Sequence, residues 1–194
     1  MHFGLMAALL RVTAVRRFAQ SCFTSGGTRY TKTHEWLRTD GGSIVLGMSD
    51  FAQKLMGEVY WLDLPGVGSK FKRAQVIAIV EGMKRPPDAS GEADDDGSCP
   101  GEAVFPEIYQ QKGWQIQEVT IGRMGNMHTI TREVLAPADC EVVEANSRLE
   151  LEQDLVNTSA ENDGWLLRLQ LCEQSDDLMD AAEYMTHVKA EFQE

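Results

Sequence analysis

The chain has 194 residues, 43% of them hydrophobic, which is enough for one domain with its own core and short appendages. Its 18 Lys and Arg against 30 Asp and Glu give a formal net charge of −12, which argues against nucleic-acid binding because a phosphate backbone requires a basic surface. The four cysteines form no CxxC pair and the four histidines show no HxxxH spacing, so the sequence predicts no metal site.

The first 26 residues differ in composition from the rest. Residues 1–33 contain no Asp or Glu, and arginines interrupt an apolar stretch that Ser and Thr follow. This composition is typical of a mitochondrial transit peptide. The apolar run Met6–Leu10 is too short to span a bilayer, and a secretory signal would carry its charges before that run. We expect residues 1–26 to be a transit peptide, residues 27–194 to be the functional domain, and the mature protein to lie in the mitochondrial matrix.

Short strands and one short helix are predicted between residues 30 and 84. A Gly-Gly turn precedes the first apolar strand, and Ser49 is placed to cap the helix. The next strand is rich in β-branched and aromatic residues and ends at a Pro-Gly break. A continuous apolar run then predicts a buried strand. The predicted elements are strands over Ser43–Gly47, Gly57–Leu64 and Val76–Glu81, and a helix over Asp50–Met56.

Residues 85–131 differ from both flanks. Four of the chain's six prolines lie here, and Ala89–Gly101 is small, acidic and rich in glycine. Such a composition buries too little apolar surface to order itself, so we expect a flexible segment. Trp114–Ile121 is expected to form a transient strand at most.

Order is predicted to resume near Arg132. Glu141–Ala145 and Trp165–Leu171 are predicted strands, and in the second of them apolar residues occupy alternate positions. Asp176–Phe192 repeats apolar residues every three or four positions, which predicts a helix with one apolar stripe. The sequence therefore predicts a compact, mainly β domain with helices at its edge and one long interruption.

Lys84 follows closely on the predicted buried strand Val76–Glu81. If the strand ends there, the lysine lies at a turn with its amine in water, where a ligase can attach an acyl cofactor. An ordinary surface lysine that closes a strand is the alternative, and the surrounding sequence must decide between them.

The segments on both sides of Lys84 resemble the H protein family of the glycine cleavage system. The most specific parts are the THEW start, the FAQ…GEV…LPxxG run and the DGW near the end. The matching segments are Tyr30–Leu37, Gly47–Gly68, Glu81–Lys84, Glu133–Asn146, Leu155–Asn157, Glu161–Leu169 and Ala182–Lys189.

The resemblance implies the lipoyl/biotinyl-like hybrid barrel-sandwich of antiparallel strands, with a short helix after the first strands and a C-terminal helix. It implies lipoic acid bound covalently to Lys84, and no catalysis by the chain itself. The lipoyl arm would collect an aminomethyl group at a pyridoxal-phosphate glycine decarboxylase and yield the carbon to a tetrahydrofolate-dependent aminomethyltransferase. Dihydrolipoamide dehydrogenase would reoxidise the dithiol, and a lipoyl-attaching enzyme is a further implied partner. A membrane or nucleic-acid partner is not implied.

The resemblance also implies a cleft that receives the loaded arm, where a carboxylate can pair with its amine. The matching acid is Glu35, whose ordinary alternative is a solvated acid at a strand edge. His34 and Trp36 match as packing or wall residues, and Asp63 lies near the same cleft in the family pattern. An enzyme finds little support, because no nucleophile–base pair or phosphate-binding glycine loop is present.

The resemblance is interrupted directly after Lys84, and the family pattern resumes only at Arg132–Pro137. Residues 85–131 are therefore predicted to be an insertion, either a lineage-specific loop or retained intron sequence. Two alternatives to a lipoyl carrier stay open. One is a biotinyl carrier, because Gly82-Met83-Lys84 resembles a biotin acceptor turn. The other is a degenerate, unmodified module that keeps the β core for binding.

Overall fold

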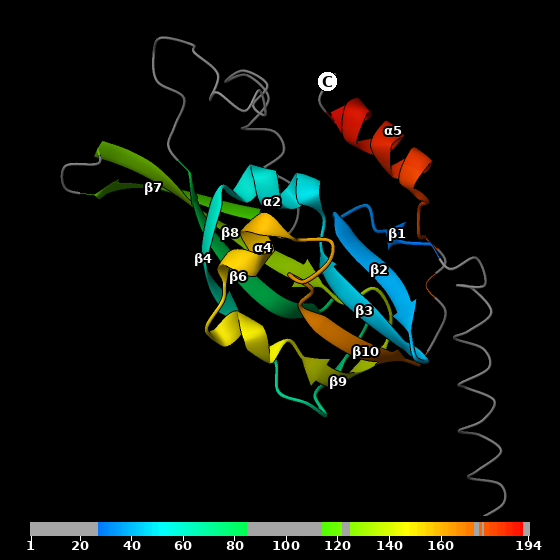
Figure 1. The fold of residues 1–194 in the computed structure, drawn as a ribbon. Coiled ribbons are helices and arrows are strands. Elements are labelled where there is room, and N and C mark those ends of the chain that lie inside the picture. Colours follow the sequence, from blue (N-terminus) through cyan, green and yellow to red (C-terminus); the bar gives the residue numbers. More distant parts are fainter. Residues whose placement is uncertain (1–26, 85–113, 122–124, 173–174, 176, 192–194) are drawn as a thin grey trace, which may run out of the picture.

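A computed structural model of the chain describes residues 27–84, 114–121, 125–172, 175 and 177–191. The predicted transit peptide, residues 1–26, and residues 85–113 of the predicted insertion lie outside the described residues. The described part is mainly β, with two antiparallel sheets and short helices at their edges, as expected from the sequence (Figure 1). No helix within these ranges is long and apolar enough to cross a membrane.

The first sheet has the strand order β1-β2-β3-β10-β9-β5, and every neighbouring pair is antiparallel. In β10 the leucines are buried, whereas the intervening Arg168 and Gln170 are half-exposed, which is the period of two that predicted this strand. The six strands are β1 (Arg29–Tyr30), β2 (Glu35–Asp40), β3 (Ser43–Met48), β5 (Lys70–Phe71), β9 (Cys140–Ala145) and β10 (Leu167–Leu171).

The second sheet has the strand order β4-β6-β8-β7 and is also antiparallel throughout. β7 and β8 form a continuous ladder from Trp114↔Arg132 to Ile121↔Gly125. The four strands are β4 (Glu58–Asp63), β6 (Val76–Lys84), β7 (Trp114–Ile121) and β8 (Gly125–Leu135).

The expectation of a flexible segment is therefore wrong for residues 114–121 and 125–131. The ladder with β8 pairs the backbone groups of β7, and Trp114, only 6% exposed, adds a large aromatic side chain to the main core. All four prolines of residues 85–131 and most of their acids precede Trp114, and Trp114–Ile121, expected to be a transient strand at most, forms a paired strand.

Short helices flank the sheets. α2 (Asp50–Met56) has its predicted bounds, and Ser49 caps it by accepting a hydrogen bond from the Ala52 amide. The 3₁₀ helix η2 (Ser147–Glu150) and α4 (Asp154–Thr158) connect β9 to β10.

The C-terminal helix α5 (Ala181–Glu191) begins later than the predicted Asp176. Asp180 sets this start, because its carboxylate accepts hydrogen bonds from the Ala182 and Glu183 amides while its own amide donates to the Glu183 side chain. Before the cap, Met179 bridges to Tyr30 of β1, so this part of the chain is extended.

The main core lies between the two sheets, since its buried side chains come from both. A smaller cluster joins α5 to the first sheet, where Tyr184 stacks on Tyr30 with ring centroids 4.3 Å apart and Val188 is buried beside them. Met185, which was placed on the predicted apolar stripe, is 54% exposed. The buried face of α5 is therefore defined by Tyr184 and Val188, and it fixes the helix against β1.

Candidate functional site

Lys84 is the last residue of β6 and pairs with His128 of β8. Its side chain is half-buried, and its Nζ donates a hydrogen bond to the backbone carbonyl of Lys54, 3.3 Å away. That carbonyl lies in the last turn of α2, where a helix leaves carbonyl groups without helical partners and favours a positive charge. The lysine amine is thus held at the C-terminal end of this helix.

Two glycines allow the end of α2 to approach the end of β6. A Cβ atom added at Gly82 would lie 2.6 Å from the Met56 carbonyl oxygen, closer than real Cβ atoms come. A Cβ atom at Gly57 would lie 2.6 Å from the Met83 carbonyl oxygen and 2.9 Å from the Lys84 Cβ, and Gly57 has a φ of +71°. Because backbone packs on backbone here, α2 holds the position from which the Lys84 side chain starts.

The residues that would form the predicted turn after Lys84 lie outside the described part of the chain. The strand does end at Lys84 within the described residues, but β8 runs alongside it and continues past it to Gly125. Within the described residues, Lys84 lies at the end of a strand that is paired with β8. Its cross-strand neighbour His128 was missed by sequence reasoning, because the two residues are far apart in the chain and share no local pattern.

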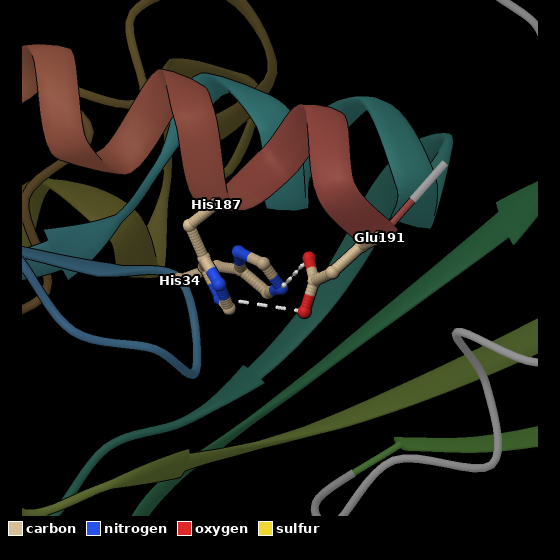
Figure 2. Close-up of side chains that lie close together, drawn as sticks. All are labelled: His34, His187 and Glu191. Carbon is tan, nitrogen blue, oxygen red and sulfur yellow. Dashed lines mark ion pairs between the residues drawn. The ribbon is translucent and has the colours of Figure 1, made fainter. Parts of the chain in front are cut away.

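A second group of polar side chains lies where α5 meets the loop between β1 and β2 (Figure 2). His34 comes from that loop, and His187 and Glu191 come from successive turns of α5. Glu191 places one carboxylate oxygen 3.3 Å from Nε2 of His34 and the other 3.3 Å from Nε2 of His187. The two imidazole rings lie face to face, with centroids 5.7 Å apart.

His34 is held tightly. It is 1% exposed, and its φ of +66° is uncommon for a residue other than glycine. Its Nδ1 lies 3.0 Å from the Tyr184 hydroxyl, which also bonds to the Ser49 hydroxyl at 2.7 Å. Burial lowers the pKa of His34 to about 3, and the charges of Arg132 and His187 act in the same direction. The imidazole is therefore neutral at physiological pH, and its Nε2 has no hydrogen-bond partner among the described residues.

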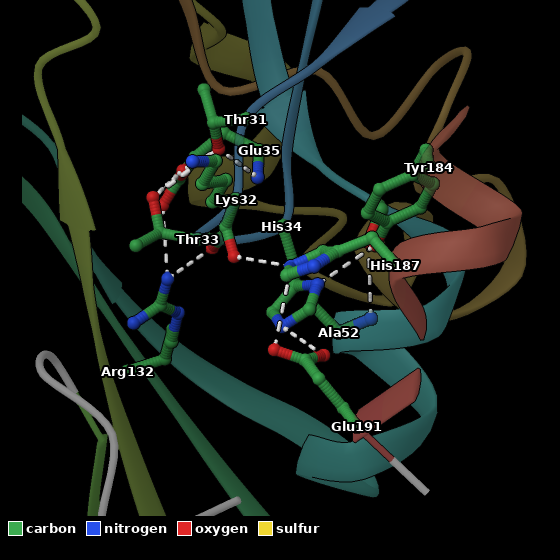
Figure 3. Close-up of polar contacts among 11 residues, drawn as sticks. Thr31, Lys32, Thr33, His34, Glu35, Ala52, Arg132, Tyr184, His187 and Glu191 are labelled. Carbon is green, nitrogen blue, oxygen red and sulfur yellow. Dashed lines mark hydrogen bonds and ion pairs between the residues drawn. The ribbon is translucent and has the colours of Figure 1, made fainter. Parts of the chain in front are cut away.

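Glu35 is the first residue of β2 and is 2% exposed (Figure 3). Arg132 donates to its Oε1 at 3.0 Å, and the hydroxyls of Thr31 and Thr33 donate to its Oε2, the second of them at 2.5 Å. The carboxylate predicted to pair with an amine is thus already paired with a guanidinium and two hydroxyls.

Arg132 of β8 supplies the positive charge of this buried pair and is itself 1% exposed. Its guanidinium also donates to the Thr33 carbonyl and lies over the Trp114 ring, 4.8 Å from the centroid. Burial lowers the pKa of Arg132, and the negative charge of Glu35 opposes that shift. Sequence reasoning did not place Arg132 or Trp114 in the site, because Arg132 is 97 residues from Glu35 and lies on the other sheet, so that only the packing of the two sheets brings them together.

The other predicted residues lie elsewhere. Asp63 ends β4, is exposed and pairs with Ile79, five residues before Lys84 on β6. At ~3.3 Å per residue this is about 17 Å along the strand, so Asp63 does not adjoin Lys84. Trp36 is fully buried and donates from Nε1 to the Ala160 carbonyl at 3.0 Å, as a packing residue does.

The group of His34, His187 and Glu191 was also not predicted. The sequence was searched for HxxxH, whereas the local signal here is a histidine and a glutamate four residues apart on α5. The third member comes from a loop more than 150 residues away in the chain. Two imidazole nitrogens and a carboxylate form a donor set that suits a divalent transition metal.

Comparison with known proteins identifies the family. The family model of the glycine cleavage H-protein matches residues 28–94 and 107–191. The glycine cleavage system H protein of Methylocella silvestris is 32% identical over 163 residues, which cover 83% of this chain and 94% of that protein. The glycine cleavage system H protein of Nitratidesulfovibrio vulgaris is 29% identical over 163 residues, covering 84% of this chain and 93% of that protein.

A solved structure has the same fold. The crystal structure of a glycine cleavage system H protein from Mycobacterium marinum matches with a TM-score of 0.55 and 18% identity, covering 84% of this chain and 98% of that chain. At this identity the likeness shows the fold alone, and it agrees with the fold class predicted from the sequence.

The family match also bears on the predicted insertion. It leaves only residues 95–106 between its two matched stretches, so an insertion over the whole of 85–131 is not confirmed. Because the family model covers most of the chain and the relatives are matched along nearly their full length, the chain belongs to the glycine cleavage H-protein family, whose members are carrier proteins rather than enzymes.

Proposed function

We propose that this chain is the lipoyl-bearing carrier of a glycine cleavage system, with lipoic acid joined to Nζ of Lys84 through an amide bond. The observation that carries the proposal is the position of Lys84 at the end of β6, where the contacts of Gly82 and Gly57 with their neighbours hold its backbone against α2. Membership of the family supports the choice of cofactor, and the resemblance on both sides of Lys84 supports the choice of lysine.

A fixed base and a flexible arm suit a carrier. The sheet and α2 define where the arm begins, while the lysine and lipoyl chains rotate about many single bonds. Tethering then replaces the diffusion of a labile intermediate with a high effective concentration at each partner's active site. Attachment also converts the ammonium into a neutral amide, whose N–H can still donate to the Lys54 carbonyl.

The proposed cycle has three partners. At a pyridoxal-phosphate glycine decarboxylase the lipoyl disulfide is opened, so that one sulfur takes the aminomethyl group and the other becomes a thiol. A tetrahydrofolate-dependent aminomethyltransferase then removes the carbon and leaves a dithiol. Dihydrolipoamide dehydrogenase reoxidises the dithiol to the disulfide. The names of the matched relatives support this assignment, because each is an H protein of the glycine cleavage system.

The proposed arm-contact residues differ in what they can offer. Asp63 is exposed, so its carboxylate is accessible to an amine. Direct pairing of Glu35 with the arm would require the amine to displace Arg132 or a threonine hydroxyl. We therefore propose that Glu35 positions the start of β2 against β8, and that neither Glu35 nor the buried His34 binds the arm directly.

We also propose that residues 1–26 direct import into the mitochondrial matrix. The support is their acid-free, arginine-containing composition. Fusion of residues 1–26 to a fluorescent protein should send it to the matrix, and replacing Arg11, Arg16 and Arg17 together by Gln should leave it in the cytosol. For the segment after Lys84 we propose a natural loop, because residues on both sides of 95–106 match the family model.

The lipoyl proposal is tested by mass spectrometry of the full chain expressed with a lipoyl-attaching enzyme and lipoic acid. We expect one lipoyl group, located on the peptide that contains Lys84, and none in Lys84→Arg. The matched control is Lys54→Arg, which changes the neighbouring lysine but keeps the backbone carbonyl that Lys84 contacts.

Function is then measured with the three partner enzymes by release of carbon dioxide from glycine. We expect Lys54→Arg to retain this activity and Lys84→Arg to abolish it. An unmodified Lys84 would favour the degenerate binding module, and a mass increase that matches biotin would favour the biotinyl carrier. Either result would overturn the proposal.

A further inference from the structure

We propose that His34, His187 and Glu191 form a zinc-binding site that fastens α5 to the loop between β1 and β2. This inference does not depend on the proposed lipoyl function, because it is argued only from the three side chains and their immediate surroundings. It rests on the donor set, on the spacing of the donor atoms and on the orientation of the buried His34.

The donor set fits zinc. Zn²⁺ binds imidazole nitrogen at ~2.0–2.1 Å and carboxylate oxygen at ~2.0–2.2 Å, and two histidines with one glutamate are a known combination that leaves one position open. At these bond lengths, the ligand atoms of a tetrahedral site lie about 3.4 Å apart. Both nitrogen-to-oxygen separations in the cluster are 3.3 Å, and all three ligand atoms lie within 4.8 Å of one another. Small side-chain rotations would therefore complete the geometry.

The orientation of His34 gives an independent indication. Its Nε2 is buried and lies 3.3 Å from Glu191 Oε2, yet that contact does not have hydrogen-bond geometry, and no other partner serves Nε2 among the described residues. A buried nitrogen without a partner is costly in a folded protein. A metal ion between the nitrogen and the Glu191 carboxylate would give the buried Nε2 a partner, because both groups would then be ligands of the same ion.

The proposal assigns the Nδ1–H tautomer to His34, and the surroundings are compatible with it. When the Nδ1 hydrogen of His34 is donated to the Tyr184 hydroxyl, the Nε2 lone pair is directed into the cluster. The Tyr184 hydroxyl is positioned in turn by Ser49, so the ligand is oriented by an outer shell of hydrogen bonds, as metal-bound histidines usually are.

His187 has a competing contact. Its Nε2 lies 3.1 Å from the Lys32 carbonyl, which can only accept a hydrogen bond. Zinc binding through this nitrogen removes its proton, and the Lys32 carbonyl then becomes an acceptor for a water on the open coordination position. The site thus spans the β1–β2 loop and two turns of α5, so metal binding is expected to stabilise the docking of the helix.

The test uses the full chain, purified without a metal-binding tag and treated with chelator. Zn²⁺ is titrated in competition with a chromophoric chelator, and Co²⁺ is used as a spectroscopic substitute to report the coordination geometry. We expect one saturable site, and at least ~10-fold weaker binding in His187→Gln and in Glu191→Gln, because even outer-shell changes cost that much. Both residues lie near the end of α5, so these variants should fold, which circular dichroism verifies.

His128→Gln is the matched control, because it removes a histidine outside the cluster. We expect its zinc affinity to equal that of the unchanged chain. The proposal is overturned if the unchanged chain shows no saturable binding at micromolar Zn²⁺. It is equally overturned if the folded His187→Gln and Glu191→Gln variants bind Zn²⁺ as tightly as the control, since the metal would then bind elsewhere.

Discussion

His34 and Glu35 are consecutive residues, both buried, and their side chains enter two polar clusters on opposite sides of one loop (Figure 3). Glu35 accepts hydrogen bonds from a guanidinium and two hydroxyls, so its charge is fully balanced. His34 has one ring nitrogen bonded to Tyr184 and the other without a hydrogen-bond partner among the described residues. A saturated cluster contributes to architecture, whereas an unsaturated one retains the capacity to bind.

The largest effect is expected from breaking the saturated cluster. Arg132→Met leaves the Glu35 carboxylate buried without its counter-charge, which should lower the free energy of unfolding by ~3–5 kcal/mol. Urea denaturation at neutral pH measures it. Arg168→Met is the control, because Arg168 pairs with Asp40 and Glu144 near the surface and should cost about 1 kcal/mol or less. A similar loss of unfolding free energy in the two variants would show that the buried Arg132–Glu35 pair contributes no more than the ion pairs of Arg168.

Removal of the Trp114 ring from the Arg132 guanidinium is expected to have the next largest effect on the free energy of unfolding. Trp114→Leu removes the ring that lies on the buried guanidinium and should cost about 2 kcal/mol. The same denaturation experiment applies, with Trp61→Leu as control because Trp61 is 42% exposed on β4. If the two tryptophan variants are equally stable, β7 is not part of the cooperative fold.

A smaller effect on stability is expected from removing the hydroxyl that orients His34. Tyr184→Phe removes one hydroxyl and with it the bonds to His34 and Ser49, which should cost about 1 kcal/mol. It should also weaken zinc binding by ~10–100-fold, as the loss of an outer-shell partner does. Tyr60→Phe, with its hydroxyl on the exposed Glu81 contact, should change neither quantity. Unchanged zinc affinity in Tyr184→Phe would contradict the assigned tautomer of His34.

The smallest effect on stability without metal is expected from Glu191→Gln, about 0.5 kcal/mol. The difference should appear on adding zinc. At a free Zn²⁺ concentration 100 times its dissociation constant, the unchanged chain should gain ~2.7 kcal/mol, whereas a variant that binds ~10-fold more weakly should gain about 1.4 kcal/mol. Thermal unfolding with and without Zn²⁺ measures both. If Zn²⁺ stabilised the two chains equally, the His34 cluster would not be the one that binds the metal.

Local patterns in the sequence predicted much of the fold. α2 has its predicted bounds because its cap and composition are local, and β10 follows from its alternation. β7 was predicted to be a transient strand at most, because its stability comes from pairing with β8 and from the burial of Trp114. Neither contribution can be read from the composition of the segment itself. The late start of α5 depends on Asp180 and Glu183, a capping pair that the sequence contains, whereas the predicted start rested on the apolar stripe alone.

The candidate site could be predicted only in part. Lys84, Glu35 and His34 were selected by resemblance, but their partners come from distant segments. Arg132 reaches Glu35 across 97 residues, and Tyr184 reaches His34 across 150. Such pairs arise from sheet topology and helix docking, so no window of the sequence contains both members.

These long sequence separations between contacting residues determine when the domain can finish folding during synthesis. β10 is the central partner of β3 and β9 but is made after both, so the first sheet has an open edge until residues 167–171 have left the ribosome. The bridge from Tyr30 to Met179 must wait still longer. Until then the apolar face of β3 is accessible to other chains, and a nascent chain that stalls before residue 167 is expected to depend on chaperones.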